Sequence, residues 1–433
     1  MSSPEQIEMD GRCDWNQSLD KLPVNCDVLV IGCGPAGSAC AKVLAQAGLH
    51  VVQADARTFP RDKTCGDGLV PDTHAALRRL GVLDEVLSAA HVVQAARCVA
   101  PSGRYIDVPG ELAVIPRRKL DAILCRAAVQ AGSTMVAPAR FVAPLISASG
   151  RITGATLVAD ENARDIQARW IILATGAAAD NLELLGMCQR RGASSMAMRA
   201  YVRHPGLAQV VPGMRFTWHS ELKGGYGWVF PGPDHIFNIG IGTFPAAAPA
   251  VNGRAGPTER KNLRAMFADF QRVDPVAKRL VEEGEVVGQP AGAPLRCDLE
   301  GAQWSRDGLL LAGDAAGATY AFSGEGIGKS LETGIACAEV LLEHVQWNGQ
   351  TSDVEDTAVR KSHSARLTAL LPQFRMYRKA ASFNQHPWLL NLVIWRAQNS
   401  PRIIRALADI LAERRQPDSL FSWRGLRGLL LRG

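Results

Sequence analysis

The feature that most constrains this chain is a glycine-rich turn that directly follows a short apolar run near the N-terminus. Residues 27–31 read Asp-Val-Leu-Val-Ile, which is typical of a buried parallel strand, and the turn occupies residues 32–37. A helix is expected from Ala36 to Gly48, and a second strand at residues 50–54. A strand, turn, helix and strand at this spacing predict a βαβ nucleotide-binding unit.

Each small residue of the turn has its own role in such a unit. Gly32 makes the tight turn, Gly34 lets the backbone approach a pyrophosphate, and Gly37 lets the helix lie close to the strand. Pro35 and Ala36 open the helix, whose free N–H groups and partial positive charge favour a phosphate. The turn therefore predicts nucleotide binding.

Two acidic residues complete the predicted nucleotide site. Asp55 lies 21 residues after Gly34, where its carboxylate can bind a pair of ribose hydroxyls; the alternative is an exposed acid at a strand end. Asp314 follows Gly313 after the apolar run 309–312 and can bind a sugar-like polyol; the alternative is a helix N-cap. A glycine turn paired with a Gly-Asp so much later in the chain indicates FAD rather than NAD.

A second glycine-rich stretch, Ser-Gly-Glu-Gly-Ile-Gly at 323–328, follows the Gly-Asp pair. Its small residues predict that the chain passes under a flat ring there, with Gly324, Gly326 and Ile327 as cofactor contacts. No further glycine fingerprint follows a strand, so the sequence contains no separate nicotinamide domain. We therefore expect NAD(P)H or another external electron donor.

The pattern along the chain predicts an α/β protein. Residues 197–243 resemble antiparallel strands rich in aromatic side chains and interrupt the nucleotide-binding pattern. We expect a discontinuous, Rossmann-like FAD-binding domain with an inserted antiparallel β-sheet substrate domain and a helical C-terminal region. The expected boundaries are a polar leader at 1–25, the FAD-binding domain at 26–185 and 290–345, the β-rich domain at 186–289 and the basic helical region at 346–433.

Taken together, the sequence resembles the geranylgeranyl reductase family of flavoproteins. That family shares a para-hydroxybenzoate-hydroxylase-like fold with flavin monooxygenases and flavin-dependent halogenases. The resemblance covers about residues 26–345 and rests on the turn at 32–37, Phe-Pro-Arg-Asp-Lys-Thr-Cys-Gly-Asp at 59–67, Arg117 before Leu120-Asp121, Gly313-Asp314 with Gly324-Glu-Gly326, and Tyr226-Gly-Trp-Val-Phe-Pro231 followed by Gly240-Ile-Gly242. Halogenases have WxWxIP in that strand, where this chain has Tyr226 and Phe230.

The resemblance implies roles for several residues. It directs Arg117 at the cofactor, with a surface charge at a helix start as the alternative. It places Cys65 close to the flavin and the substrate tunnel, where its thiol can donate a proton; the alternative is a small residue in a tight loop. It also implies a substrate wall, with ordinary core packing as the alternative, made of Tyr226, Trp228, Phe230, Pro231, Gly240 and Gly242.

The expected reaction is reduction of a carbon–carbon double bond in an apolar, isoprenoid-like substrate by hydride transfer from reduced flavin. The alternative is an FAD-dependent monooxygenase, or with less support a halogenase, acting on an aromatic or other secondary-metabolite substrate. A non-enzymatic FAD-binding protein is a third reading. The intact cofactor motifs and the aromatic strand favour the reductase.

Charge is concentrated at the C-terminus. Residues 361–433 contain 13 Lys and Arg against three acidic residues, a net of +10 in a chain whose total is +6. An apolar stripe at 403, 404, 407, 410 and 411 precedes Phe421, Trp423, Leu426, Leu429 and Leu430. A basic amphipathic helix with Trp predicts peripheral contact with an anionic membrane; the alternative is a helical cap on the enzyme.

The remaining composition predicts a cytoplasmic protein, peripheral at the inner face of a membrane. The first 25 residues are polar and lack the apolar segment of a signal peptide, and no apolar run is long enough to span a bilayer. The ten cysteines are scattered without zinc-like spacing, so we expect reduced thiols and no metal site. Nothing supports nucleic-acid binding, and the sequence leaves the oligomeric state open.

Overall fold

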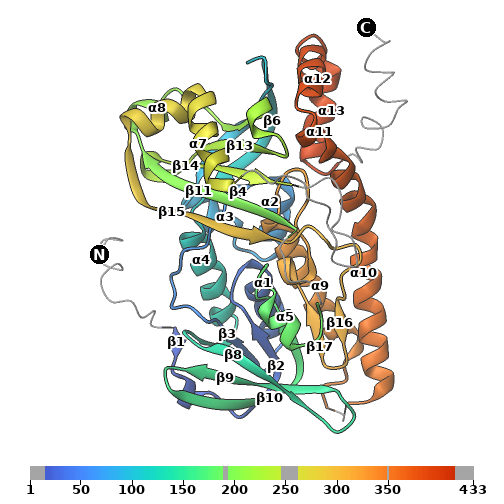
Figure 1. The fold of residues 1–433 in the computed structure, drawn as a ribbon. Helices are drawn as coiled ribbons and strands as arrows, with labels where there is room; N and C mark the ends of the chain where they lie inside the picture. The colour runs from blue at the N-terminus through green and yellow to red at the C-terminus, as the bar shows by residue number, and fades with distance from the viewer. Residues whose placement is uncertain (1–14, 189–193, 245–261, 349–350, 415–433) are drawn as a thin grey trace.

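Two sheets form the centre of the protein (Figure 1). The computed structural model describes residues 15–188, 194–244, 262–348 and 351–414. The first sheet is mainly parallel, and its central strands are nearly continuous apolar runs, as burial on both faces requires. It comprises β1 (Asn16–Gln17), β2 (Asn25–Ile31), β3 (Val51–Ala54), β7 (Thr134–Val136), β8 (Arg140–Ile146), β9 (Ile152–Ala159), β10 (Asn162–Leu173), β16 (Ser305–Arg306) and β17 (Leu309–Leu311).

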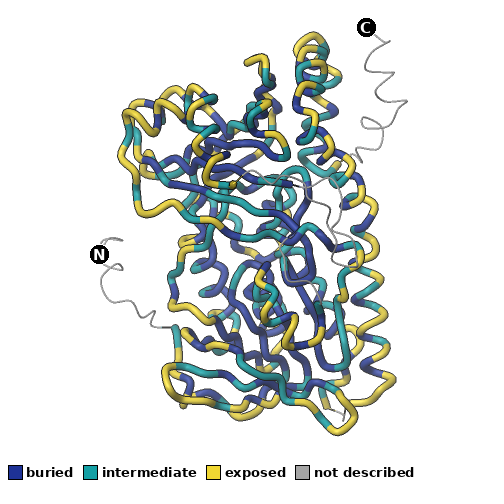
Figure 2. The backbone as a smooth tube through the Cα atoms, viewed as in Figure 1, coloured by how far each residue is buried: buried dark blue, intermediate teal, exposed yellow. Residues whose placement is uncertain are grey.

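The strand order of this sheet is β1-β7-β3-β2-β10-β17-β16, with β9 paired to β10 and β8 paired to β9. Successive side chains of β2 point to opposite faces and enter two separate apolar cores. Val28 and Val30 pack on one face, with the helices that follow the two cofactor motifs, whereas Leu29 and Ile31 pack on the other. Figure 2 shows this sheet as a buried layer.

The second sheet has the strand order β15-β11-β14-β13-β12-β5-β6-β4. It comprises β4 (Gly68–Leu69), β5 (His91–Val99), β6 (Tyr105–Val114), β11 (Ser195–Arg203), β12 (Met214–Thr217), β13 (Gly225–Pro231), β14 (Ile236–Thr243) and β15 (Glu285–Leu295). The strands from 195 to 243 pair antiparallel, as expected. Three strands come from residues 68–114, a segment that the pattern analysis assigned to the FAD-binding domain. The domain boundaries therefore stay a prediction.

Helices cover both sheets (Figure 1). They are α1 (Pro35–Gln46), α2 (Pro71–Arg79), α3 (Leu83–Ser88), α4 (Arg117–Gln130), α5 (Asp180–Leu184), α6 (Pro205–Ala208), α7 (Leu263–Val273), α8 (Pro275–Glu283), α9 (Ile327–His344), α10 (Asp353–Ala380), α11 (Ser382–Gln385), α12 (Trp388–Gln398) and α13 (Pro401–Leu411). Helices α7 and α8 are separate, because Asp274 takes an extended conformation before Pro275 and caps α8 with its carboxylate.

Helices α11, α12 and α13 lie against the second sheet, whereas α10 packs on α9 and on β16 of the first sheet. Ile403, Leu407 and Leu411 pack into the core beneath β5 and β6, and Leu411 touches Gly110 of β6. The helical part of the predicted amphipathic stripe is thus confirmed as a helix, but most of its apolar side chains face protein. The predicted apolar residues 421–430 lie outside the described residues. No helix in the described ranges combines the length and apolar character that a membrane crossing needs.

Candidate active site

The predicted phosphate turn leaves β2 at Gly32, whose φ of +101° lies in the left-handed region. A Cβ at Gly32 would collide with the carbonyl oxygen of Ala174, and one at Gly37 would overlap the carbonyl oxygen of Gly32. Both glycines are therefore required by backbone contacts. Pro35 and Ala36 form the first turn of α1, as the sequence predicts.

Gly34 lies at the N-terminus of α1 and differs from the other two glycines. Its φ of −76° is accessible to any residue, and a Cβ there would lie 3.5 Å from Nη2 of Arg61 and 3.8 Å from Nη2 of Arg117. Only the ends of two flexible cationic side chains therefore fill the space in front of the helix. A helix N-terminus beside two guanidinium groups fits the diphosphate of a dinucleotide.

Asp55 follows β3, lies against the phosphate turn and is almost completely buried. Its Oδ2 accepts a hydrogen bond from the backbone N–H of Cys33 at 2.9 Å and pairs with Arg61 at 3.3 Å. The alternative of an exposed strand-end acid is therefore wrong. Binding of a ribose by Asp55 stays a prediction, and in this structure Arg61 takes one of its oxygens.

Arg117 is also buried, so the alternative of a surface charge is wrong. Its Nε donates to Oδ1 of Asp121 at 2.7 Å, and Arg61 Nη1 lies 3.0 Å from Oδ2 of the same carboxylate. Asp121, which is fully buried, thus holds both cations over the turn. The sequence reasoning gave no role to Arg61 or Asp121; the four-residue spacing of Arg117 and Asp121 on a helix was the available signal.

The second cofactor motif lies beside the first. A Cβ on Gly313, whose φ is +62°, would be 3.0 Å from the Cβ of Ala36 in α1, and 3.0 Å from Oγ of Ser330 in α9. The side chain of Asp314 accepts a hydrogen bond from the hydroxyl of Thr319. Burial raises the pKa of Asp314, and the positive charges of Lys63 and Arg117 oppose that rise. Lys63, which the sequence reasoning did not single out, thus faces this motif together with Arg117.

The loop at 323–328 closes the same space. A Cβ on Gly326 would lie 2.6 Å from Oγ1 of Thr319 and 3.6 Å from Oδ1 of Asp314. Gly324 has a φ of +68° and lies against the ring of Phe244. Ile327 begins α9 and packs in the same apolar cluster as Cys65. The structure thus brings all predicted cofactor motifs to one place.

The turn Cys65-Gly66-Asp67 is fixed by a hydrogen-bond network that the sequence did not reveal. Asn238 of β14 donates to the carbonyl oxygen of Cys65 at 2.7 Å and to Oδ2 of Asp67 at 2.8 Å. The hydroxyl of Tyr201 donates to the same Oδ2 at 2.5 Å, and the backbone N–H of Arg117 donates to Oδ1 at 3.3 Å. The turn therefore joins the cofactor side to the second sheet.

Two side chains of this turn have raised pKa values. Burial raises the pKa of Asp67 to about 6, although hydrogen bonds from Tyr201 and Asn238 work against the rise. Burial also raises the pKa of the Cys65 thiol, which the nearby charge of Arg117 partly offsets. Cys65 is therefore a thiol at neutral pH and can hold a proton near the cofactor motifs.

The predicted substrate wall is a close-packed aromatic cluster. Three aromatic side chains of β13, those of Tyr226, Trp228 and Phe230, are 4%, 5% and 6% exposed. Tyr226 contacts the rings of Phe216, Trp218 and Phe244, Phe230 contacts Phe216, and Trp218 stacks on Phe322. Gly240 lies under the indole of Trp228 and Gly242 under the ring of Phe244. Pro231 ends β13 and pairs with Phe237. Contact of a substrate with this cluster stays a prediction.

Comparison with known proteins matches residues 25–271 to the family model described as FAD binding domain. A menaquinone reductase of Mycolicibacterium smegmatis is 32% identical over 73% of this chain and 76% of the relative. A digeranylgeranylglycerophospholipid reductase of Methanopyrus kandleri is 28% identical over 74% of this chain and 78% of the relative.

Solved structures share the fold. A geranylgeranyl bacteriochlorophyll reductase-like protein of Thermoplasma acidophilum superposes with a TM-score of 0.64 at 21% identity, covering 89% of this chain and 99% of the other. Flavin-dependent halogenases and an FAD-dependent monooxygenase have the same fold at 18% identity. The fold alone therefore does not distinguish these chemistries.

Proposed function

We infer a double-bond reductase from the premise that the chain belongs to the FAD binding domain family and is an FAD-dependent oxidoreductase. Its relatives are named for menaquinone and for digeranylgeranylglycerophospholipid, two molecules that carry polyprenyl chains. Each isoprene unit of such a chain contains one carbon–carbon double bond. We therefore propose that this chain saturates a double bond in an apolar, isoprenoid-like substrate, with NAD(P)H or another external donor supplying the electrons.

One observation carries the proposal: the Cys65-Gly66-Asp67 turn is fixed to the aromatic strand through Asn238. Asn238 bonds the turn at Cys65 and Asp67, and its Oδ1 accepts from the indole of Trp228. This link ties the turn that carries Cys65 to the aromatic strand, and the Cys65 thiol lies near Arg117 and Lys63, two cations that also face Asp314. An apolar site with a placed proton donor suits reduction of an alkene.

The residues of the chain would hold FAD through both cofactor motifs. The turn at 32–37, with Arg61 and Arg117, would bind the diphosphate, and Asp55 and Asp314 would bind the sugar and polyol hydroxyls. Bound FAD, once reduced, supplies hydride. The aromatic cluster orients the apolar substrate and excludes water, and Cys65 holds the proton for the second carbon.

An anaerobic assay tests the proposal. The flavin is reduced with dithionite under nitrogen and then mixed with menaquinone or with a geranylgeranyl lipid. We expect the flavin to reoxidise and the polyprenyl chain of the product to gain two hydrogen atoms, measured by mass spectrometry after any quinol has been returned to quinone in air. The reductase proposal fails if the reduced flavin reacts with neither alkene. If the enzyme then inserts oxygen into an aromatic acceptor in air, the chain is a monooxygenase.

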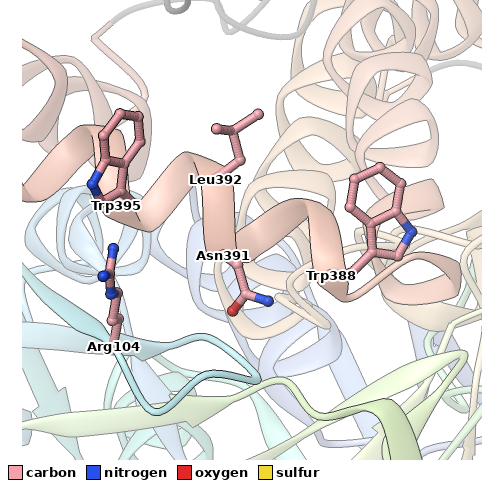
Figure 3. A pocket seen from close by; sticks show the side chains of 5 residues that line it. All are labelled: Arg104, Trp388, Asn391, Leu392 and Trp395. Atoms are coloured by element: carbon pink, nitrogen blue, oxygen red, sulfur yellow. The ribbon is translucent and has the colours of Figure 1, made fainter.

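We further propose a cytoplasmic protein that contacts the inner face of a membrane. Cys33 and Cys125 lie close together in the interior and are nonetheless free thiols, which suits a reducing compartment. Helix α12 exposes Trp388, Leu392 and Trp395, which line a shallow depression together with Arg104 and Asn391 (Figure 3). Exposed indoles beside a cation suit the interface of an anionic bilayer. Within the described residues, this surface of α12 supports membrane contact, whereas the apolar stripe on α13 packs against protein.

A further inference from the structure

A nearly buried ammonium group lies at the centre of a second polar cluster, next to the cofactor motifs. The side chain of Lys329 in α9 is 2% exposed and lies 3.4 Å from Asp72, 2.7 Å from Glu332 and 2.9 Å from Glu413. These partners come from α2, from α9 and from the residues that directly follow α13.

A hydroxyl connects this cluster to the loop at 323–328. Oγ1 of Thr73 lies 3.4 Å from Oδ1 of Asp72 and 3.4 Å from Oε1 of Glu325. Glu325 stands between Gly324 and Gly326, in the loop that closes the cofactor site. A continuous row of proton-exchanging groups thus runs from Lys329 through Asp72 and Thr73 to Glu325.

The two ends of the row face different surroundings. At the outer end, the side chains of Glu332 and Glu413 are 43% and 22% exposed and meet solvent. At the inner end, a Cβ on Gly324 would lie 3.3 Å from the hydroxyl of Tyr226, which donates to the carbonyl oxygen of Ser323. The inner carboxyl therefore belongs to the loop that touches the aromatic cluster.

We propose that Glu325, Thr73, Asp72 and Lys329 form a relay that carries a proton from Glu332 and Glu413 at the surface to the reaction site, with Glu325 as its inner end. The inference rests on the proposed double-bond reduction. Saturating one double bond breaks its π bond and forms two C–H bonds, one with hydride from the reduced cofactor and one with a proton. The proton given to carbon is replaced through Glu325, whose carboxylate regains a proton from Asp72 through the Thr73 hydroxyl.

Electrostatics agree with this geometry. Burial raises the pKa of both Glu325 and Asp72. The carboxylate of Asp72 raises the pKa of Glu325 further, those of Glu413 and Glu332 raise the pKa of Asp72, and the charge of Lys329 opposes both rises. The buried cluster therefore retains a proton near neutral pH, as a relay requires. The titratable groups that face Glu325 from the surrounding elements are Asp72, Lys329, Glu413, Tyr226 and Tyr377. Glu332 and Tyr320 face the other members of the cluster.

A capping role for Glu325 makes different predictions. Its Oε1 accepts a hydrogen bond of 2.6 Å from the backbone N–H of Gly328, in the first turn of α9. A glutamine amide oxygen can accept the same hydrogen bond but cannot carry a proton. Glu325→Gln therefore separates the two roles. Thr73→Val removes the hydroxyl at nearly constant shape and leaves both carboxyls in place.

The first measurement does not depend on turnover. Infrared titration of the FAD-loaded protein is expected to show a protonated carboxyl band near neutral pH, which Glu325→Gln removes. The second measurement is the steady-state reduction of a geranylgeranyl lipid under nitrogen with excess dithionite, because the relay is needed when the Cys65 thiol regains its proton between turnovers. Glu325→Gln is expected to slow it by about 10²-fold to 10⁴-fold at neutral pH, and Thr73→Val by about tenfold or more, with unchanged flavin binding. Glu339→Gln, on the outer part of α9 and paired with Arg366, is the matched control and should change neither result.

The outcomes separate this proposal from the proposed function. If wild-type reduced enzyme fails to reduce menaquinone or a geranylgeranyl lipid, the reductase function fails, and the infrared band still decides whether Glu325 holds the proton. If the band survives Glu325→Gln, or if both variants turn over at the wild-type rate over the whole pH range, the relay is overturned and Glu325 is a helix cap.

Discussion

The indole Nε1 of Trp228 donates a hydrogen bond of 2.9 Å to Oδ1 of Asn238, inside an otherwise apolar cluster. The amide nitrogen of Asn238 donates to the carbonyl oxygen of Cys65 and to Oδ2 of Asp67, in the Cys65-Gly66-Asp67 turn. Trp228 is thus both a wall residue and an anchor for the turn. Asn238 therefore connects the turn at 65–67, on the cofactor side, to β13 of the second sheet.

Asn238→Ala should therefore destabilise the protein. The change leaves the Trp228 N–H, the Cys65 carbonyl and one Asp67 oxygen short of a partner in a buried place, at a cost of about 2 to 4 kcal/mol in the free energy of unfolding. Urea denaturation followed by fluorescence measures this. Asn399→Ala, at an exposed position, should change the free energy of unfolding little. Equal losses of stability for both variants would contradict the connecting role of Asn238.

Gly34→Val should give a folded but colourless protein. The backbone conformation at Gly34 accepts any residue, and a side chain there meets only movable guanidinium tips, so the fold survives while the valine occupies the place of the diphosphate. Absorbance in the flavin band measures the loss of the cofactor, and circular dichroism measures the retention of the fold. Gly37→Val, whose Cβ would overlap backbone, should instead fail to fold. Yellow Gly34→Val protein would falsify the cofactor assignment.

Cys65→Ala should still bind FAD, because the diphosphate and polyol contacts belong to other residues. If the thiol gives the proton to carbon, reoxidation of reduced enzyme by an alkene should slow by about one to four orders of magnitude. Stopped-flow absorbance under nitrogen gives the rate. Cys98→Ala, at a cysteine of the second sheet, is the control, and a Cys65→Ala enzyme as fast as this control reduces Cys65 to a small loop residue.

Asp67 should make the flavin-free protein less stable as the pH rises. Its pKa in the folded state is about 6, above its ordinary value of 3.8, so the folded state binds the proton more tightly than the unfolded state. This contribution is fully present below about pH 4 and is lost as the pH rises through 6, by up to about 3 kcal/mol. Urea unfolding between pH 4.5 and 7 should show a steeper decline for wild type than for Asp67→Asn. Parallel curves would be the contrary result.

Replacing Trp388 and Trp395 together with alanine should weaken binding to anionic vesicles. Both indoles are exposed on α12, with Arg104 next to Trp395, and exposed Trp prefers the bilayer interface (Figure 3). Vesicle flotation measures the bound fraction, which should also fall with added salt. Leu184→Ala, an exposed apolar position on α5, should have no effect. Wild-type flotation that is negligible on neutral and anionic vesicles alike returns the C-terminal region to a structural cap.

The sequence by itself determined the βαβ unit, the cofactor and the family resemblance. These depend on local rules: Gly32 needs a positive φ, Gly37 needs close packing, and the apolar runs at 27–31 and 309–312 can only be buried strands. Such constraints act on each residue and its chain neighbours. The identity of the residues therefore suffices to read them.

Only the tertiary structure decided which side chains meet. Asn238 and Cys65 are 173 residues apart, and Thr73 and Glu325 are 252 apart, and neither pair has a local pattern that marks it. The strands at 68–114 look like part of the cofactor domain until pairing places them in the second sheet. The stripe on α13 reads as a membrane face until β6 covers it. Burial and long-range hydrogen bonds depend on where the whole chain folds, because a side chain is recognised as a partner only once another segment has been brought beside it.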